Sequence, residues 1–133
     1  MIDVREFVQK TLDDEFEHDG LRSYWLRRID TDERAREYIV YTLGGVTPDA
    51  YADNRVFIRT ASVTFRYFYN EEFILTAKGR EHIRKTEKRI AKTLRRAGFS
   101  LPDGWFDAGD IDDIGYGATI FEAVLQEVDG WRP

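Results

Sequence analysis

The sequence predicts a single α+β domain in which an antiparallel or mixed β-sheet of about four strands packs against two main α-helices. Three observations predict this class. Apolar residues recur at helical spacing in two segments, residues 3–17 and 76–97. Between them, residues 60–67 alternate polar and apolar side chains, which is typical of a strand with one buried face. Clusters of Gly, Pro, Asn and Asp separate the segments, as turns require.

The composition is that of a folded domain without cysteine chemistry. At 133 residues the chain is long enough to bury a core, and its 42% hydrophobic share argues against disorder. The absence of Cys excludes a disulfide framework, a thiolate nucleophile and a cysteine metal site. No apolar run approaches the roughly 20 residues of a membrane helix, and the first residues lack a signal-peptide pattern. We therefore expect no membrane contact and a soluble protein of the cytoplasm or of a virion.

An amphipathic helix is predicted from Asp3 to about Glu17. Asp3 and Glu6 form a D-x-x-E variant of the capping box, and Gly20 is expected to stop the helix. Acidic residues crowd its C-terminal end, against the helix dipole. We expect them to form a solvated face, with a partner-binding surface as the alternative; they are Asp13, Asp14, Glu15 and Glu17.

Two strands are predicted after the first helix. Residues 23–29 (SYWLRRI) form a short candidate, and residues 37–43 (EYIVYTL) form a firmer one because their apolar residues alternate. Gly44-Gly45 is expected to end the second strand. The following residues to Asn54 are rich in turn formers and lead into the next strand.

The strand predicted from Arg55 to Tyr69 is unusually long. Its 15 residues would reach roughly 50 Å at about 3.3 Å per residue, well beyond the usual strand of about five or six. At Val56, Phe57 and Ile58 the alternation breaks and both faces become apolar. A β-bulge would explain this break, and so would a segment covered on both sides, by this chain or by a partner.

A second, longer helix is predicted from the cap residue Thr76 to about Ala97, with Gly98 at the left-handed C-terminal position. Its expected core stripe is narrow and consists of Gly79, Ile83, Thr86, Ile90, Leu94 and Ala97. Basic residues are expected on the opposite side: Lys78, Lys85, Lys88, Lys92 and Arg96.

The C-terminal part gives a weaker prediction. Residues 99–117 are expected to form a loop, because they hold Pro102, four glycines and five aspartates. Residues 118–128 place apolar side chains at helical spacing, and Thr119 with Glu122 forms a capping box. Half of this run also fits a strand. The local pattern by itself favours a helix.

Charge is separated along the chain. Residues 78–96 hold nine Lys/Arg and two Glu, a balance of +7, although the whole chain carries −5. Residues 101–133 hold eight acids and one Arg, a balance of −7. Such separation concerns partners and assembly. The basic helix is expected to face solvent or a neighbouring subunit; contact with nucleic acid is the alternative, although this face lacks aromatic residues that would stack on bases.

No catalytic, cofactor-binding or metal-binding residue is predicted. The aspartates at 107, 110, 112 and 113 suggest calcium, but an EF-hand loop starting at Asp110 would have Phe121 at its twelfth position. An acidic loop facing solvent or a partner is therefore favoured. His18 and His82 are expected to be ordinary surface residues, and no serine lies in a nucleophile-elbow context.

The order of these elements resembles a known family. An amphipathic helix precedes EYIVYTL, a turn containing YADN, the long TASVTFRYFY strand, a second helix and an acidic C-terminal segment. Over most of the chain this is similar to the tail-terminator and tail-completion proteins of long-tailed bacteriophages and prophages. The resemblance implies an α+β fold, assembly into homo-oligomeric, typically hexameric, rings that join tail to head, and residues 118–128 as the last strand. It carries over no catalytic motif.

These inferences combine into one functional hypothesis. The chain is expected to be a non-enzymatic structural virion protein whose partners are further copies of itself and other tail or head-completion proteins. Any DNA contact is expected not to be sequence-specific. The alternatives are a nucleic-acid-binding module using Lys78 to Arg96 and a metal-dependent hydrolase using the aspartate loop. The residues expected to take part in assembly are Arg55, Phe57, Arg59, Lys78, Lys85, Lys88, Lys92, Arg96, Asp110 and Asp112.

Overall fold

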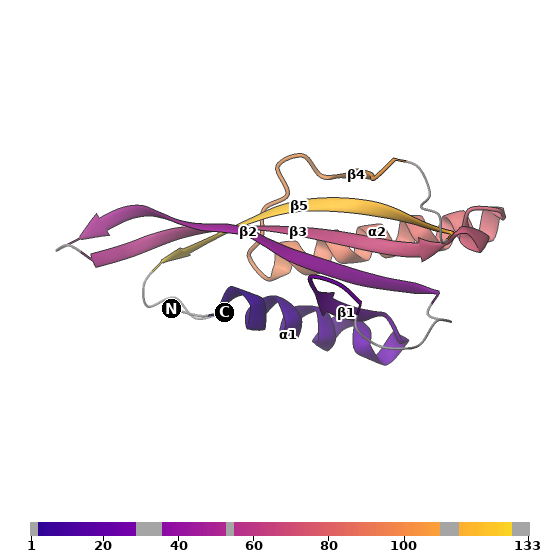
Figure 1. Ribbon diagram of the computed structural model, residues 1–133, viewed down its shortest axis with the longest axis horizontal. Coiled ribbons are helices and arrows are strands. Elements are labelled where there is room, and N and C mark those ends of the chain that lie inside the picture. The colour runs from indigo at the N-terminus through magenta and orange to yellow at the C-terminus, as the bar shows by residue number, and fades with distance from the viewer. Residues whose placement is uncertain (1–2, 29–35, 53–54, 110–114, 129–133) are drawn as a thin grey trace.

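A computed structural model of the chain describes residues 3–28, 36–52, 55–109 and 115–128, without the side chains of 47–58 and 127–128. Two helices lie against one sheet (Figure 1). The helical elements are α1 (Val4–Phe16), α2 (Ala77–Arg96) and two 3₁₀ turns, Glu17–Asp19 and Glu71–Phe73. The strands are β1 (Arg22–Trp25), β2 (Glu37–Ala52), β3 (Arg55–Asn70), β4 (Trp105–Asp107) and β5 (Tyr116–Val128).

The sheet is mixed and has the strand order β1-β2-β3-β5-β4. β1 runs parallel to β2, whereas the other neighbours are antiparallel. This confirms the predicted α+β class, with five strands in place of about four. The additional strand, β4, lies within the segment that was expected to be loop, so that expectation is wrong for Trp105–Asp107. Its three residues pair with β5 at the sheet edge, a contact that the local sequence does not encode.

α1 forms as predicted and buries one face. Asp3 is its N-cap, and the carboxylate accepts a hydrogen bond of 2.9 Å from the backbone N–H of Arg5. The buried residues are Val4, Val8, Leu12 and Phe16, at the spacing of one helix face. The helix ends at Phe16, and a 3₁₀ turn then leads to Gly20, whose positive φ of 79° allows the reversal.

α2 also has the predicted ends. The hydroxyl of Thr76 accepts a hydrogen bond of 3.0 Å from the N–H of Gly79, and Gly98 has a φ of 104°. Its buried stripe is wider than expected, because Ala91 and Thr93 are buried in addition to Ile83, Thr86, Ile90 and Leu94. α2 therefore docks on the sheet through a broader band than one narrow seam.

The core lies between the helices and one face of the sheet. The odd positions of β3 from Ala61 to Tyr69 are all buried, which confirms the predicted alternation. Phe65 and Tyr67 are fully buried at the centre, between the side chains of β2 and β5. On the other face of the sheet a smaller aromatic cluster forms around Tyr38, Val40 and Tyr116, with Tyr24 and Phe68 packed against it.

β1 is shorter than the predicted strand of residues 23–29. It spans Arg22–Trp25 and stops because Leu26 takes a positive φ of 72°. Residues 29–35, which follow, lie outside the described residues.

Gly44-Gly45 does not end β2, which was predicted to stop there. The strand continues to Ala52 through three register irregularities against β3. Between the pairs Leu43–Val63 and Gly45–Ser62, Gly44 is the extra residue, as a β-bulge requires. The segment 44–52 reads as turn-forming, yet pairing with β3 holds it extended. Nonlocal hydrogen bonds thus override local propensity.

The expected irregularity near Phe57 is confirmed. Ala50 pairs with Ile58, whereas the next residue, Tyr51, pairs with Val56, so that Phe57 is the unpaired extra residue of β3. Of the two explanations for the broken alternation at residues 56–58, the structure therefore contains the bulge.

Residues 118–128 form a strand, so the helix favoured by the local pattern is wrong. β5 pairs with β3 from Tyr116–Asn70 to Val128–Ile58. Thr119, Phe121, Ala123 and Leu125 are buried on the core face, which is a period of two. The strand implied by the family resemblance is the correct assignment, because thirteen residues of pairing with β3 outweigh the local helical spacing.

Candidate functional site

The end of the β2–β3 hairpin projects beyond the rest of the fold. We call residues 47–52 and 55–60 the hairpin arm. Both strands continue past the ends of α1 and α2, toward the left of Figure 1. The pairing with β5 stops at Ile58, whereas the pairing of β2 with β3 continues to Ala52 and Arg55. The tip of the arm is therefore a two-stranded ribbon.

Three of the predicted assembly residues belong to this arm. Arg55 begins β3 and pairs with Ala52, Phe57 is the bulged residue, and Arg59 pairs with Pro48 on one side and Glu127 on the other. The structure places their backbone together on one projecting element. The prediction that they act in assembly remains a prediction.

The outer edge of β2 is long and interrupted. β1 pairs only with Tyr38–Tyr41, so that residues 42–52 have no partner strand on that edge within the described parts of the chain. Pro48 cannot donate a backbone hydrogen bond, and register irregularities occur after Leu43, Pro48 and Ala50. Proline and bulges are the means by which natural edge strands avoid unspecific strand addition. A partner of the arm would therefore have to match a bent ribbon rather than extend a flat sheet.

The basic face of α2 forms as predicted. Its five residues, Lys78, Lys85, Lys88, Lys92 and Arg96, are all exposed. Lys85 makes an ion pair of 3.2 Å with Glu81 on the same helix. The other four have no ion pair among the residues that the structure describes. This face is an open cationic surface.

Arg89 has a different role from its basic neighbours. Its Nε donates to Glu15 Oε1 at 2.9 Å and its Nη1 donates to Asp19 Oδ2 at 2.6 Å. The guanidinium also lies 4.7 Å over the ring of Phe16. These contacts raise the pKa of Arg89, chiefly through the hydrogen bonds to Glu15 and Asp19. The acidic end of α1 was predicted to be a solvated face. The structure differs in part, because Glu15 also binds Arg89 and so links α1 to α2.

His82 is exposed as expected but belongs to a polar cluster. Its Nε2 lies 2.7 Å from Glu37 Oε2, and its ring stacks on Phe73 with centroids 5.1 Å apart. The hydroxyl of Tyr67 donates to Glu37 Oε1 at 3.0 Å. Burial first, and Glu37 second, raise the pKa of Tyr67. The cluster joins α2 to the starts and ends of neighbouring strands.

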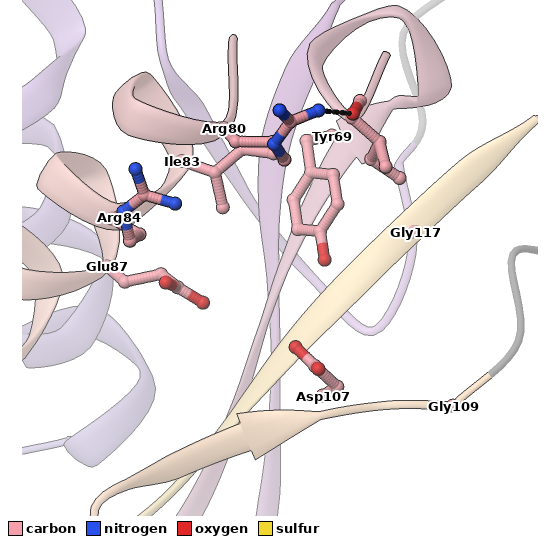
Figure 2. Close-up of a pocket in the computed structure, with 9 residues that line it drawn as sticks. Tyr69, Arg80, Ile83, Arg84, Glu87, Asp107, Gly109 and Gly117 are labelled. Atoms are coloured by element: carbon pink, nitrogen blue, oxygen red, sulfur yellow. Dashed lines mark hydrogen bonds between the residues drawn. The ribbon is translucent and has the colours of Figure 1, made fainter. Parts of the chain in front are cut away.

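A pocket of about 380 Å³ lies between α2, the end of β3, β4 and β5 (Figure 2). Glu87, Asp107 and the hydroxyl of Tyr69 point into a common space. Thr119, fully buried on β5, donates its hydroxyl to Glu87 Oε2 at 2.5 Å. Arg80 turns away, and its Nη1 donates to the carbonyl of Ile74 at 2.8 Å.

Two side chains that line the pocket, Glu87 and Tyr69, have raised pKa values. Burial raises the pKa of Glu87, Asp107 raises it further, and the hydrogen bond from Thr119 acts in the opposite direction. Burial likewise raises the pKa of Tyr69. Sequence reasoning missed this pocket because its residues come from four elements. The only local signal is Gly117, where a Cβ would lie 2.8 Å from a ring carbon of Tyr69; only glycine lets the ring lie against β5.

The two remaining predicted residues, Asp110 and Asp112, lie outside the described residues. Among the described residues no group of three or more His, Cys, Asp or Glu is placed to hold a metal ion. Within the same residues no helix is long and apolar enough to cross a membrane.

Comparison with known proteins adds little. No family model and no curated protein matches the chain. One similar solved structure covers 97% of this chain and 98% of that chain, with a TM-score of 0.49 and 8% sequence identity. A likeness at that level supports no conclusion about function.

Proposed function

We propose that the protein is a structural subunit of a bacteriophage or prophage tail, a tail terminator or head–tail joining component that assembles into a homo-oligomeric ring. The element order that suggested this family agrees with the fold, including residues 116–128 as the last strand. The observation that carries the proposal is the hairpin arm, which extends past both helices and past the last pair of β5 with β3.

The two-stranded tip of the arm would gain stability from a third strand or a packed layer. An isolated hairpin is at best marginally stable in water, and three strands or a packed layer are needed for stability. The arm carries Tyr51, Val56, Phe57 and Ile58 in its sequence, an apolar content that water disfavours. Contact with the next subunit would supply the missing layer. A contact between different surfaces of identical subunits closes into a ring when the rotation permits.

Light scattering and native mass spectrometry over a range of concentrations test the proposal. We expect a ring-sized oligomer, or a concentration-dependent approach to one, with rings visible by negative-stain electron microscopy. A strict monomer at near-millimolar concentration would contradict the proposal.

A variant with a shortened arm tests whether the arm is needed for assembly. Pro48 pairs with Arg59, so residues 49–58 can be replaced by Asn-Gly, a two-residue hairpin turn, at the loss of a single pair with β5. This variant should keep its circular dichroism spectrum and lose the oligomer. Phe57→Asp is a milder second variant in case the shortened chain does not fold. An oligomer that survives both changes would show that the arm is not the assembly element.

A second candidate function is binding of nucleic acid, favoured by the open cationic face of α2. Lys85 and Lys92 lie seven residues apart on that face and are both exposed. Phosphate contacts by such residues would give salt-dependent binding without sequence preference. Duplex DNA binding at moderate salt that is lost on Lys85→Glu plus Lys92→Glu would place this function first. Absence of binding at low salt would exclude it.

A further inference from the structure

Exposed apolar side chains gather at the base of the hairpin arm. Of the five large apolar side chains that are exposed in the described part of the chain, three lie here: Trp25 (45% exposed) and Leu26 (58% exposed) at the end of β1, and Val46, directly before the arm. Val46 is on the helix side of the sheet, because its pairing partner Ala61 is buried there. Trp25 faces the same side, where Arg5 of α1 lies 4.8 Å over its ring. We call Trp25, Leu26 and Val46 the base patch.

A pocket of about 550 Å³ adjoins the base patch, between β1 and the first two turns of α1. Trp25, Tyr41 and Ser23 are among the residues that line it. Ser23 is only 7% exposed, and its hydroxyl has no hydrogen-bond partner among the described residues. A buried hydroxyl without a partner is unfavourable, and a docked chain carries backbone donors and acceptors that can satisfy it. The pocket therefore favours a bound segment of polypeptide.

We propose that the base patch and this pocket of one copy receive the hairpin arm of a second copy. The inference rests on the ring proposed above and names the surface on which each arm docks. The arm of the same chain extends away from the pocket, because its strands continue past the start of α1 (Figure 1). Arm and docking surface are different parts of the subunit, so the contact is head-to-tail and can close into a ring.

The arm matches this surface in polarity and in charge. Its β3 strand, residues 55–60 (RVFIRT), combines three apolar residues with two arginines and contains no acid. Carboxylates dominate the field in the pocket: burial raises the pKa of Tyr41, and Asp13 and Asp3 raise it further, against the weaker opposite effect of Arg5. An apolar strand with basic ends thus meets an apolar surface with a negative field, and such complementarity gives an interface its specificity.

The base patch is held in place before any partner arrives. Leu26 has a positive φ of 72° and is fixed by two backbone hydrogen bonds. Its N–H donates to the carbonyl of Tyr41 at 2.9 Å, and the N–H of Arg27 donates to the carbonyl of Trp25 at 2.9 Å. Tryptophan is enriched among the few residues that dominate the energy of interfaces. Trp25 is therefore the expected anchor of the docked arm, at a low cost in ordering.

Photo-crosslinking identifies what occupies the patch. Protein with Trp25→p-benzoylphenylalanine is labelled with ¹⁵N, mixed with unlabelled parent and irradiated, and the linked peptides are identified by mass spectrometry. We expect labelled β1 peptides to be linked to unlabelled peptides that contain residues 47–60. The same probe at Phe106 is the matched control, since Phe106 is 44% exposed on β4 at the opposite edge of the sheet. It should not link to the arm.

Two substitutions test whether the patch contributes to assembly. Trp25→Lys should raise the concentration midpoint of assembly, measured by light scattering, at least about tenfold. Leu26→Gly should raise it as well, and glycine adopts a positive φ without strain, so the fold is kept while the exposed side chain is lost. Phe106→Lys should leave the midpoint unchanged. Circular dichroism checks that each variant is folded.

The outcomes separate this inference from the proposed function. Links from position 25 to another peptide or to none, or an unchanged midpoint for both patch variants, would overturn the docking site, and a ring-sized oligomer would then leave the proposed function standing. A closed dimer linked from position 25 to the arm would support the docking site and contradict the ring. A strict monomer would overturn both.

Discussion

Arg89 of α2 and Glu15 of α1, 74 residues apart in the chain, are joined by two hydrogen bonds. Arg89 Nε donates to Glu15 Oε1 at 2.9 Å, and Nη2 donates to the Glu15 backbone carbonyl at 2.8 Å. A third bond reaches Asp19. The planar guanidinium therefore links the acidic end of α1 to α2. Both helices pack on the same face of the sheet.

Removal of this bridge should destabilise the fold. Charge-assisted hydrogen bonds contribute more than neutral ones, but the Arg89 side chain is 42% exposed and solvent screens the pair. We expect Arg89→Ala to lower the free energy of unfolding by about 1 kcal/mol, measured by urea denaturation. Arg89→Lys should recover only part of the loss, because an ammonium cannot serve both Glu15 oxygens and Asp19 in one plane.

Lys92→Ala is the control for this prediction. Lys92 lies on the same helix, is exposed, and has no ion pair among the described residues. Its removal should leave the urea midpoint unchanged. The loss at Arg89 should shrink at high salt, since screening weakens the parent's bridge. Equal effects of the two substitutions would show that the bridge contributes no stability.

Glu87 predicts a pH dependence of stability. Burial raises its pKa in the folded protein above the ordinary carboxyl value. Between the ordinary value and the raised one the folded state binds more protons than the unfolded state, so stability falls as pH rises through that window. Glu87→Gln lacks this slope and retains an oxygen to accept the Thr119 hydroxyl. As pH rises above the ordinary carboxyl value of about 4, the melting temperature of the variant should therefore rise relative to that of the parent.

Thermal melts of parent, Glu87→Gln and the exposed control Glu122→Gln check this. The control should keep a constant offset from the parent over the same pH range. A Glu87→Gln melting temperature that falls relative to the parent with rising pH would mean that ionised Glu87 is stabilised in the fold.

Parts of the fold could be predicted because they depend on neighbours in sequence. The cap of Thr76 and the left-handed Gly98 are set within a few residues, and so is the alternation from Ala61 to Tyr69. β5 could not be predicted locally. Ile120, Phe121, Val124 and Leu125 fit one helix face as well as two strand faces, and only pairing with β3 decides between them.

The candidate sites also differ in whether they depend on residues near one another in sequence. The basic face of α2 was predictable because helical spacing alone places Lys85, Lys88 and Lys92 together. Helical spacing could not show that Arg89 turns to α1, since that depends on how two helices pack. Nor could it show the pocket, because Tyr69, Glu87 and Asp107 meet only after three elements have been placed.

Tyr41 predicts a loss of stability at alkaline pH. Its hydroxyl donates to Gln9 Oε1 at 2.6 Å, and burial, with Asp13 and Asp3, raises its pKa to about 12. Its contribution is fully present below the ordinary tyrosine value of about 10 and is lost as pH rises toward the folded value. Tyr41→Phe should therefore show a smaller decline of the urea midpoint over this window than the parent.

Tyrosinate absorbance supplies the second measurement. In the native protein the titration of Tyr41 should lag behind that of the same chain in urea, and the Phe variant should lose one such lagging tyrosine. Burial raises the pKa of Tyr67 and Tyr69 as well, so the lag should diminish without vanishing. Coincident native and denatured titrations would contradict the buried setting of these hydroxyls.

The Gly79→Ala substitution should destabilise the protein, although Gly79 lies inside a helix. In an open helix interior this change normally stabilises by about 1 kcal/mol. At Gly79 a Cβ would lie 2.7 Å from the Cα of Phe73 and closer still to its carbonyl oxygen, backbone atoms of the 3₁₀ turn that cannot move aside cheaply. We expect Gly79→Ala to lower the free energy of unfolding by about 1–3 kcal/mol in urea denaturation. Gly45→Ala, where nothing lies within 4 Å, should leave stability unchanged or raise it by at most about 1 kcal/mol. A stabilised Gly79→Ala would mean that α2 can move away from the turn, and that this contact does not fix its first residues against the end of β3.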